Sequence, residues 1–309
     1  MFVKKLVGVV LFSSSIFSIF SSVSIFISVF KLAFISRKSS IYVIAFFNII
    51  SDLLQLFYLC FYFSLSIIID QYAIAGDKVG RLSVFFGFIF LSGWFMENLL
   101  QPTMAINRFL VITFNNHNIF TFNKTMLMMT VLISAALFSA ACAQYLFPCC
   151  VFVIDYTVMA LELVTINGVH SYTNSMFLVY DSICTSISIF CYIGVFISIR
   201  NSNKKVSTQI QKQRRKQEIR YLLQFMFTSV FYITTWVIFE ILQYIIPDKK
   251  FQPHAIIPAM IILNCSSNSV IFLSINKEVK CSFQCSWFID KLGCKKATGN
   301  SQVTPVNLI

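Results

Sequence analysis

The chain has 309 residues, a formal net charge of +12 and 57% hydrophobic residues. Soluble domains contain about 45–50% apolar residues, so this composition excludes an ordinary soluble protein. The positive charge could suggest a nucleic-acid partner, but Lys and Arg lie in the gaps between apolar runs, as they do in membrane proteins. We therefore expect an integral membrane protein with no nucleic-acid partner.

Seven apolar runs are long enough to cross a bilayer, which takes about 20 residues. In chain order they predict helices at about residues 6–30, 41–69, 82–114, 125–147, 175–199, 219–246 and 254–275. A cleaved signal peptide is the alternative for the first run, although that run exceeds the about 7–15 apolar residues of such a peptide. We expect an all-α fold, with a seven-helix transmembrane domain over residues 1–275.

The segments between the runs complete this organisation. Pro148–Asn174 is expected to be a long loop that contains no Lys or Arg. Residues 276–309 are expected to form a short cytoplasmic helix and a polar tail. That helix would lie in the membrane interface, because Val279, Phe283 and Trp287 share one side between flanking Lys residues. Its cysteines are candidates for palmitoylation: Cys281, Cys285 and Cys294.

The distribution of Lys and Arg predicts the orientation. With the N-terminus outside, 18 of the 24 basic residues fall in inner segments and 6 in outer ones. Basic loops stay on the cytoplasmic side, so we expect the N-terminus outside and the C-terminus inside. Lys4 and Lys5 oppose this assignment. Eight of the inner charges lie in residues 200–220, a segment expected to contact a cytoplasmic partner or anionic lipid.

The third predicted helix carries polar residues on a single stripe. Alternating steps of four and three residues place them on one helical face: Phe90, Trp94, Glu97, Gln101, Met104 and Arg108. A charged side chain at the centre of a membrane helix costs about 2.5–3.5 kcal/mol on insertion scales. The stripe is therefore expected to face the bundle.

Other predicted helices also carry polar residues within the membrane. Asp52 on the second helix and Asn264 and Asn268 on the seventh need partners from neighbouring helices. We expect them to meet Glu97 in one buried cluster. Two carboxylates there predict a bound cation, such as sodium, or a proton. A purely structural hydrogen-bond network is the alternative.

A ligand pocket is expected in the outer half of the bundle, because aromatic rings with a few acids are typical of small-molecule sites. Its candidates lie on helices three, five and six: Phe90, Trp94, Tyr180, Asp181, Tyr232, Trp236, Glu240 and Gln243. Hydrogen bonding between helices is the alternative role for these residues.

The whole chain resembles the nematode serpentine chemoreceptors, and most closely the Srx family; the Srt and Srw families are alternatives. The segment MAINRFLVITF resembles the end of that family's third helix, RRKQEIRYLLQFMFTSVFY its entry into the sixth helix, and PCCVFVIDY its second outer loop. Asp52 matches the second-helix Asp of rhodopsin-like receptors. Asn268–Phe272 is similar to their Asn-Pro-x-x-Tyr motif, with Ser for Pro and Phe for Tyr.

The resemblance implies a G-protein-coupled chemoreceptor at the plasma membrane of sensory-neuron cilia. It would bind an odorant or pheromone among helices 3, 5, 6 and 7 and activate a heterotrimeric G protein. Asn107 and Arg108 would form the switch that faces the G protein, with Glu218 as the candidate restraint because Asn107 is neutral. Ser83 stands where such receptors have a Cys, so the usual bridge from Cys149 or Cys150 has no partner there. Cys184 is one alternative partner, and free thiols are the other.

Two further classes of function remain as alternatives. A ligand-gated channel or transporter with a helical bundle is the first, although insect-type receptor channels place the N-terminus inside. An enzyme is the second, and it is disfavoured because the three His residues lie apart and no nucleophile, metal or phosphate-binding signature is present. No cofactor is expected beyond the cation or proton.

Overall fold

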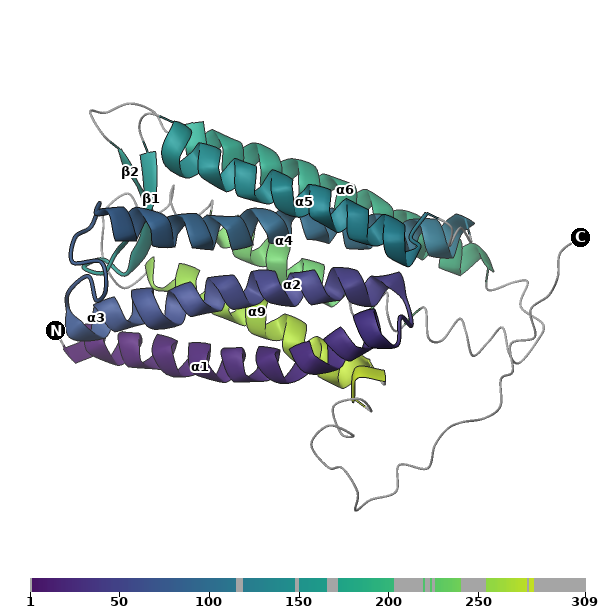
Figure 1. Cartoon of the computed structure of the whole chain (residues 1–309), viewed down its shortest axis with the longest axis horizontal. Coiled ribbons are helices and arrows are strands. Elements are labelled where there is room, and N and C mark those ends of the chain that lie inside the picture. The colour runs from purple at the N-terminus through teal and green to yellow at the C-terminus, as the bar shows by residue number, and fades with distance from the viewer. Residues whose placement is uncertain are drawn as a thin grey trace, which may run out of the picture.

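The computed structural model describes residues 2–114, 119–147, 150–165, 172–202, 219, 223, 226–239, 254–276 and 278–280. Long helices run side by side along the molecule (Figure 1). They are α1 (Phe2–Phe30), α2 (Ser40–Phe57), α3 (Leu65–Ile69), α4 (Arg81–Phe114), α5 (Phe122–Ala141), α6 (Tyr172–Ser202) and α9 (Ile256–Ile275), with a shorter apolar helix at Met226–Phe239.

Three of these helices contain wider, π-helical turns at or near one end. Lys31–Ile35 extends α1, Tyr58–Ser64 joins α2 to α3, and Cys142–Leu146 extends α5. The resulting spans are Phe2–Ile35, Ser40–Ile69 and Phe122–Leu146.

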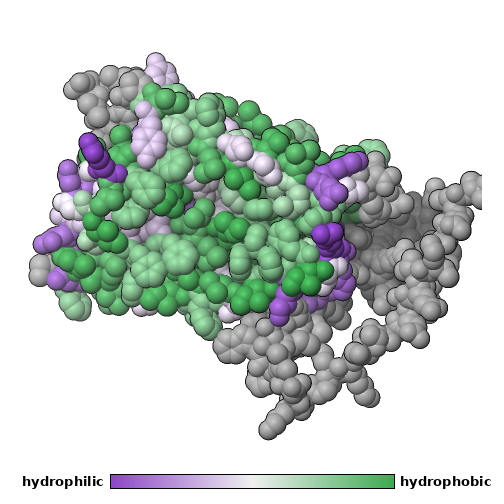
Figure 2. Space-filling model, in the orientation of Figure 1, coloured by the Kyte–Doolittle hydropathy of each residue, from purple (hydrophilic) through white to green (hydrophobic). Residues whose placement is uncertain are grey.

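Six helices of the described chain are long and apolar enough to cross a membrane. Figure 2 shows hydrophobic residues over the middle of the visible face and hydrophilic residues gathered at its two ends. This banding is what a bilayer requires, because lipid solvates apolar side chains and excludes unpaired charges. The chain is therefore a multi-pass membrane protein.

Helix α1 shows how polar residues are turned inward in such a bundle. Its serines Ser15, Ser18 and Ser22 are buried, whereas Phe17 and Phe20 are exposed. Small residues let helices approach closely in a membrane, and the hydroxyl of Ser22 lies 2.8 Å from that of Ser269 on α9. The buried face thus joins the first helix to the last.

One element differs from the sequence-based expectation. Within Pro148–Asn174, which was expected to be a loop, strands β1 (Cys150–Asp155) and β2 (Ala160–Thr165) form an antiparallel hairpin. Met159 closes the turn with a positive φ of 55°. The hairpin and the N-terminus lie at the same end of the bundle (Figure 1). Apolar and β-branched residues in both strands favour this pairing.

Candidate functional site

A cavity lies beneath the hairpin, among the helices at the N-terminal end of the molecule. Helices α4, α6, α9 and Met226–Phe239 contribute to its wall, together with both strands. The space open to the centre of a water molecule is about 10 Å³, which is about enough for one water. The cavity is therefore narrow. Its lining consists of Phe90, Trp94, Phe152, Leu161, Phe177, Asp181, Phe239 and Ile261.

The hairpin forms the cover of this cavity. The ring of Phe152 stacks on Phe90, with centroids 5.2 Å apart and planes 8° from parallel. The side-chain amide of Gln144 receives the amide hydrogen of Phe152 at 3.0 Å and donates to the carbonyl oxygen of Phe152 at 3.0 Å. At Gly87 of α4, an added Cβ would overlap the same carbonyl oxygen. Close backbone packing therefore holds β1 against α4.

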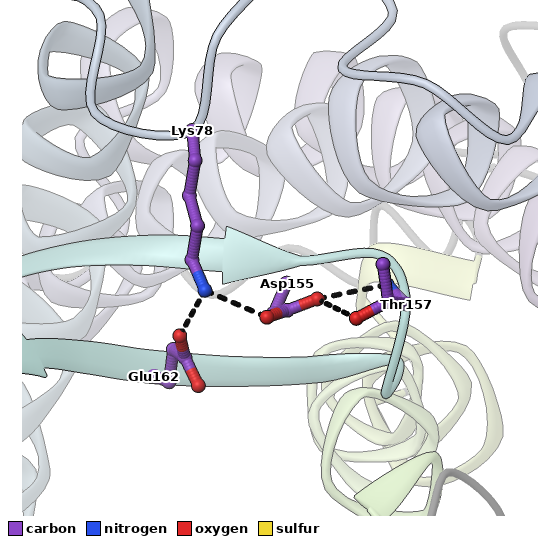
Figure 3. A network of polar contacts seen from close by, with 4 residues as sticks. All are labelled: Lys78, Asp155, Thr157 and Glu162. Atoms are coloured by element: carbon purple, nitrogen blue, oxygen red, sulfur yellow. Dashed lines mark hydrogen bonds and ion pairs between the residues drawn. The ribbon is translucent and has the colours of Figure 1, made fainter.

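Lys78 ties both strands of the hairpin to the segment between α3 and α4. Its ammonium group donates to Asp155 at 2.6 Å and also pairs with Glu162 on the other strand (Figure 3). Burial opposes the charge of Asp155, but hydrogen bonds from Lys78 and Thr157 outweigh it and lower the pKa of Asp155 to about 2. Burial also opposes the charge of Lys78, yet the hydrogen bonds to its two acids raise its pKa. Asp155 and Lys78 therefore both stay charged at neutral pH.

The N-terminal segment meets the hairpin at a second junction. Lys4 pairs with Asp70 and lies over the ring of Tyr156, 4.6 Å from the centroid. Tyr72 packs edge-on against the same ring at 4.8 Å. Burial, with the nearby Asp155 as the second cause, raises the pKa of Tyr72 to about 12. The N-terminal segment and the segment after α3 thus meet at the hairpin turn.

Asp181 is the ionisable residue of the cavity wall. Its carboxylate is buried and accepts a hydrogen bond of 2.6 Å from the hydroxyl of Tyr232, which also contacts Asn98 of α4. The ring of Trp94 lies 6.1 Å from that of Tyr232. This contact joins α4, α6 and the Met226–Phe239 helix directly at the cavity.

A polar layer lies deeper in the bundle, where helices α2, α4 and α9 meet. Asn268 donates to both oxygens of Asp52, at 3.0 and 2.9 Å. Glu97 accepts hydrogen bonds from Gln55 at 2.9 Å and from Asn264 at 2.6 Å. The four residues expected to cluster are therefore brought together in two hydrogen-bonded groups.

Several acceptors in this layer lack a hydrogen-bond partner in the described part of the chain. They are the side-chain amide oxygens of Asn48, Gln55, Asn264 and Asn268. Buried acceptors normally have a partner, so the layer has chemistry suited to a cation or to water. None of the described residues form a group of three or more His, Cys, Asp or Glu that could hold a metal ion.

The polar stripe of the third predicted helix lies on α4. It faces the bundle as expected, because all six of its residues are buried. Arg108, at its far end, is 4% exposed. Just above it, Ser229 donates to Gln101 at 2.9 Å, and its hydroxyl lies 3.2 Å from that of Tyr192 on α6. Asn107 is buried beside Arg108, and Glu218 lies outside the described residues.

The last described residues after α9 fold back onto the start of α2. Tyr42 donates to Glu278 at 2.6 Å, and Lys38 pairs with the same carboxylate at 2.8 Å. Asn276 accepts the backbone amides of Glu278 and Val279 at 3.1 and 3.2 Å. The palmitoylation candidates Cys281, Cys285 and Cys294 lie outside the described residues.

The predicted pocket residues take different positions. Phe90, Trp94 and Asp181 line the cavity, and Tyr232 contacts Asp181. Tyr180 turns away, and its hydroxyl lies 2.8 Å from that of Ser139 on α5. Trp236 is partly buried but is not a lining residue. Glu240 and Gln243 lie outside the described residues.

Five lining residues were not predicted: Phe152, Leu161, Phe177, Phe239 and Ile261. Phe177 lies one helical turn before Asp181, and Phe239 lies two turns after Tyr232, so helical spacing could have found both. The two hairpin residues could not be found while Pro148–Asn174 was taken for a loop.

The structure tests one of the two alternatives for a disulfide from Cys149 or Cys150. Cys184 is free and buried on α6, so it does not serve as the alternative partner. Ser83, at the position where a Cys would be expected, instead places its hydroxyl 2.8 Å from that of Tyr62. Cys149 lies outside the described residues, as does the side chain of Cys150.

A bundle of membrane helices around a covered cavity and a buried polar layer has the seven-helix architecture of the rhodopsin fold. The fold is similar to that of squid rhodopsin, with a TM-score of 0.73 over 91% of this chain and 84% of that chain. Sequence identity is 14%, so this likeness shows the fold alone.

The family model described as "Serpentine type 7TM GPCR chemoreceptor Srx" matches residues 12–285. The chain therefore belongs to the Srx family of serpentine chemoreceptors, and the sequence-based assignment is confirmed. A comparison with curated proteins finds no match.

Proposed function

We propose that this protein is a chemosensory receptor that binds a small molecule in the cavity beneath the hairpin and activates a heterotrimeric G protein at the opposite end. The observation that carries the proposal is the cavity itself. Five aromatic rings and one carboxyl group line it, and they come from three helices and the hairpin. A largely apolar pocket with few polar groups is the usual form of a small-ligand site.

The aromatic contacts supply a route by which a ligand could act on the helices. Phe152 stacks on Phe90, Phe90 stacks on Trp94 at 6.4 Å, and Trp94 lies 6.3 Å from Phe239. A ligand between these rings changes the packing of the Met226–Phe239 helix. That helix also carries Ser229, whose hydrogen bond reaches Gln101 above Arg108. Such differential packing is what a ligand needs to shift a population of states.

We also propose an orientation in the membrane, a cellular location, a class of cue and cytoplasmic partners. Its orientation follows the Lys and Arg distribution, with the hairpin outside and Arg108 near the cytoplasm. The plasma membrane of a sensory cilium is the proposed location, and an odorant or pheromone the proposed cue. The basic segment 200–220 and the segment after α9 would meet the G protein and anionic lipid.

The buried polar layer is proposed to hold a sodium ion or a proton between Asp52 and Glu97. The amide oxygens without partners in the described chain support this assignment. Oxygen ligands are those that hard cations prefer.

Signalling in cells tests the receptor proposal. The protein would be expressed with G-protein dissociation sensors and stimulated with a panel of volatile compounds. Truncation of the lining residue by Trp94→Ala should raise the half-maximal concentration of an activating compound at least about 10-fold, because the lost contacts are worth more than 1.4 kcal/mol.

Phe85→Ala is the matched control, because Phe85 lies on the same helix but is 48% exposed. It should leave the response unchanged at equal surface expression. Equal potency of the two variants would place the ligand elsewhere. G-protein sensors that stay silent for every compound and at every expression level would contradict the receptor function.

A further inference from the structure

The cavity beneath the hairpin combines an aromatic wall with one ionisable group. Of its eight lining residues, five are aromatic and Asp181 alone is ionisable. We propose that this cavity binds a small organic amine in its protonated form, with Asp181 as the counter-charge. The inference rests on the proposed receptor function and names the chemical class of the ligand.

Aromatic rings are the first reason for a cationic ligand. Phe90, Trp94 and Phe152 form a continuous stack along one side of the cavity, with centroid separations of 5.2 and 6.4 Å. Phe177 and Phe239 add rings from two other helices. The face of an aromatic ring attracts an ammonium group, most strongly where water is excluded and where the ring is Trp. A cavity with room for about one water meets that condition.

The placement of Asp181 is the second reason. Its side chain is 1% exposed, lies within the membrane-spanning part of α6 and reaches the cavity wall. Tyr232 donates to one carboxylate oxygen at 2.6 Å and so holds the group in place. Ionisable residues inside a membrane bundle usually mark functional sites. An ammonium group entering the cavity meets this carboxylate in a medium of low dielectric constant, where opposite charges attract strongly.

The same features disfavour other classes of odorant. A carboxylate ligand would be repelled by Asp181, and a neutral alcohol or ketone would gain neither charge pairing nor the interaction of a cation with the rings. The small volume favours few heavy atoms, such as an ammonium group on a short alkyl chain. Asp181 could instead serve only to tie α6 to Tyr232, and the experiment separates these roles.

The test measures thermal unfolding of the purified receptor with three one-carbon compounds. They are methylamine, methanol and formate, each at about 50 mM, because so small a ligand binds weakly. Methylamine should raise the Tm of the natural protein by about 2–4 °C, the shift that about 1 kcal/mol produces in a chain of this size. The alcohol and the acid should raise it by less than about 1 °C, because a compound that does not bind the folded state does not stabilise it.

Variants then assign the effect to the carboxylate. Asp181→Asn should abolish the amine shift, and Asp181→Glu should keep a preference for the amine over the alcohol. Asp77→Asn is the matched control, because Asp77 is an exposed acid at the same end of the molecule, and it should respond as the natural protein does. If Asp181→Asn fails to fold, the amine-to-alcohol preference of the natural protein and of Asp181→Glu still decides.

Three results would overturn the proposal: equal shifts with amine and alcohol, an amine shift that persists in Asp181→Asn, or no amine shift at all. Failure of the receptor function gives a different pattern. Neutral compounds that activate the G protein without any amine shift would refute the amine ligand alone. An amine shift in a protein that never activates a G protein would refute the receptor function alone.

Discussion

Asp52 and Glu97 show how single residues are held inside the membrane. Each carboxylate is fully buried and is bonded to amide groups from another helix. Helix α9 serves both, because Asn264 and Asn268 are one turn apart. This pairing was predictable from the sequence, since buried polar groups must find partners and only a few are available.

A cation in this layer would bind the folded state and stabilise it. We expect a change from 150 mM choline chloride to 150 mM sodium chloride to raise the Tm by about 2–4 °C, as about 1 kcal/mol of binding free energy requires. Asp52→Asn and Glu97→Gln should each remove this shift, because each deletes a charge that faces the site. Differential scanning fluorimetry in matched buffers measures it.

Ser92→Ala is the control for these two variants. Ser92 lies on α4 and bonds only the carbonyl of Phe88 in its own helix, at 2.7 Å, so its loss should leave the sodium shift intact. A sodium shift of equal size in Asp52→Asn would show that the layer is a structural hydrogen-bond network.

The difference between Tyr180 and Asp181 marks the limit of such reasoning at the residue scale. Both were expected in the pocket, but neighbouring residues of a helix point about 100° apart, and only Asp181 lines the cavity. Tyr180 bonds α5 instead. Which of two adjacent polar residues faces inward depends on the rotation of α6 against its neighbours, and the sequence of α6 alone does not determine that rotation.

At the scale of elements, the hairpin is the part of the fold that the sequence did not predict. Helices in a membrane satisfy their own backbone, so long apolar runs predicted them well. The strands depend on contacts far along the chain, from Gln144, Gly87 and Lys78. Such contacts leave no periodic signal in the strands themselves.

Lys78 is expected to control the stability of this hairpin. Lys78→Met leaves Asp155 and Glu162 facing one another without their shared cation. Charge-assisted hydrogen bonds contribute about 1.5–3 kcal/mol each, and the partial exposure of Lys78 places the loss at the low end. Amide hydrogen exchange in residues 150–165 should therefore accelerate at least about 10-fold, the factor that corresponds to 1.4 kcal/mol.

The pH dependence follows from the directions of the two pKa shifts. The pKa of Asp155 falls from 3.8 to about 2 in the folded protein, so its contribution is complete above about pH 5 and is lost as the pH falls through 4 towards 2. The raised pKa of Lys78 keeps its contribution complete below its ordinary value of 10.5. The difference between the natural protein and Lys78→Met should thus be constant from about pH 5 to pH 9.

Lys5→Met is the control, because Lys5 is an exposed lysine at the same end of the molecule. It should leave exchange in the hairpin unchanged. Hairpin exchange that does not differ between Lys78→Met and the natural protein at pH 7 would mean that backbone packing on α4 alone holds the cover in place.

At the scale of the whole molecule, the basic residues at the hairpin end bear on the orientation of the protein in the membrane. Four outer basic residues lie in the described chain, and two of them pair with acids: Lys4 with Asp70, and Lys78 with Asp155 and Glu162. Each of these lysines thus stabilises contacts between chain segments at that end. Such contacts give a physical reason for keeping lysine at a face where the positive-inside rule disfavours it.

The orientation with the hairpin outside is therefore expected despite Lys4 and Lys5. An epitope tag before Phe2 should be stained on intact cells, and a tag after Ile309 only after permeabilisation. The physical reason is the excess of basic residues on the other side, which retains the inner segments in the cytoplasm during insertion. Receptors carrying both tags, stained in the same cells, make the comparison independent of expression.

Lys4→Gln separates the folded-state role of this lysine from its role in insertion. If Lys4 serves the junction with Asp70 and Tyr156, its loss should lower the Tm while the N-terminal tag remains outside. An N-terminal tag that is stained only after permeabilisation in the natural protein would reverse the whole assignment. The cavity would then open towards the cytoplasm, and neither an external ligand nor a G protein at Arg108 would be compatible with the fold.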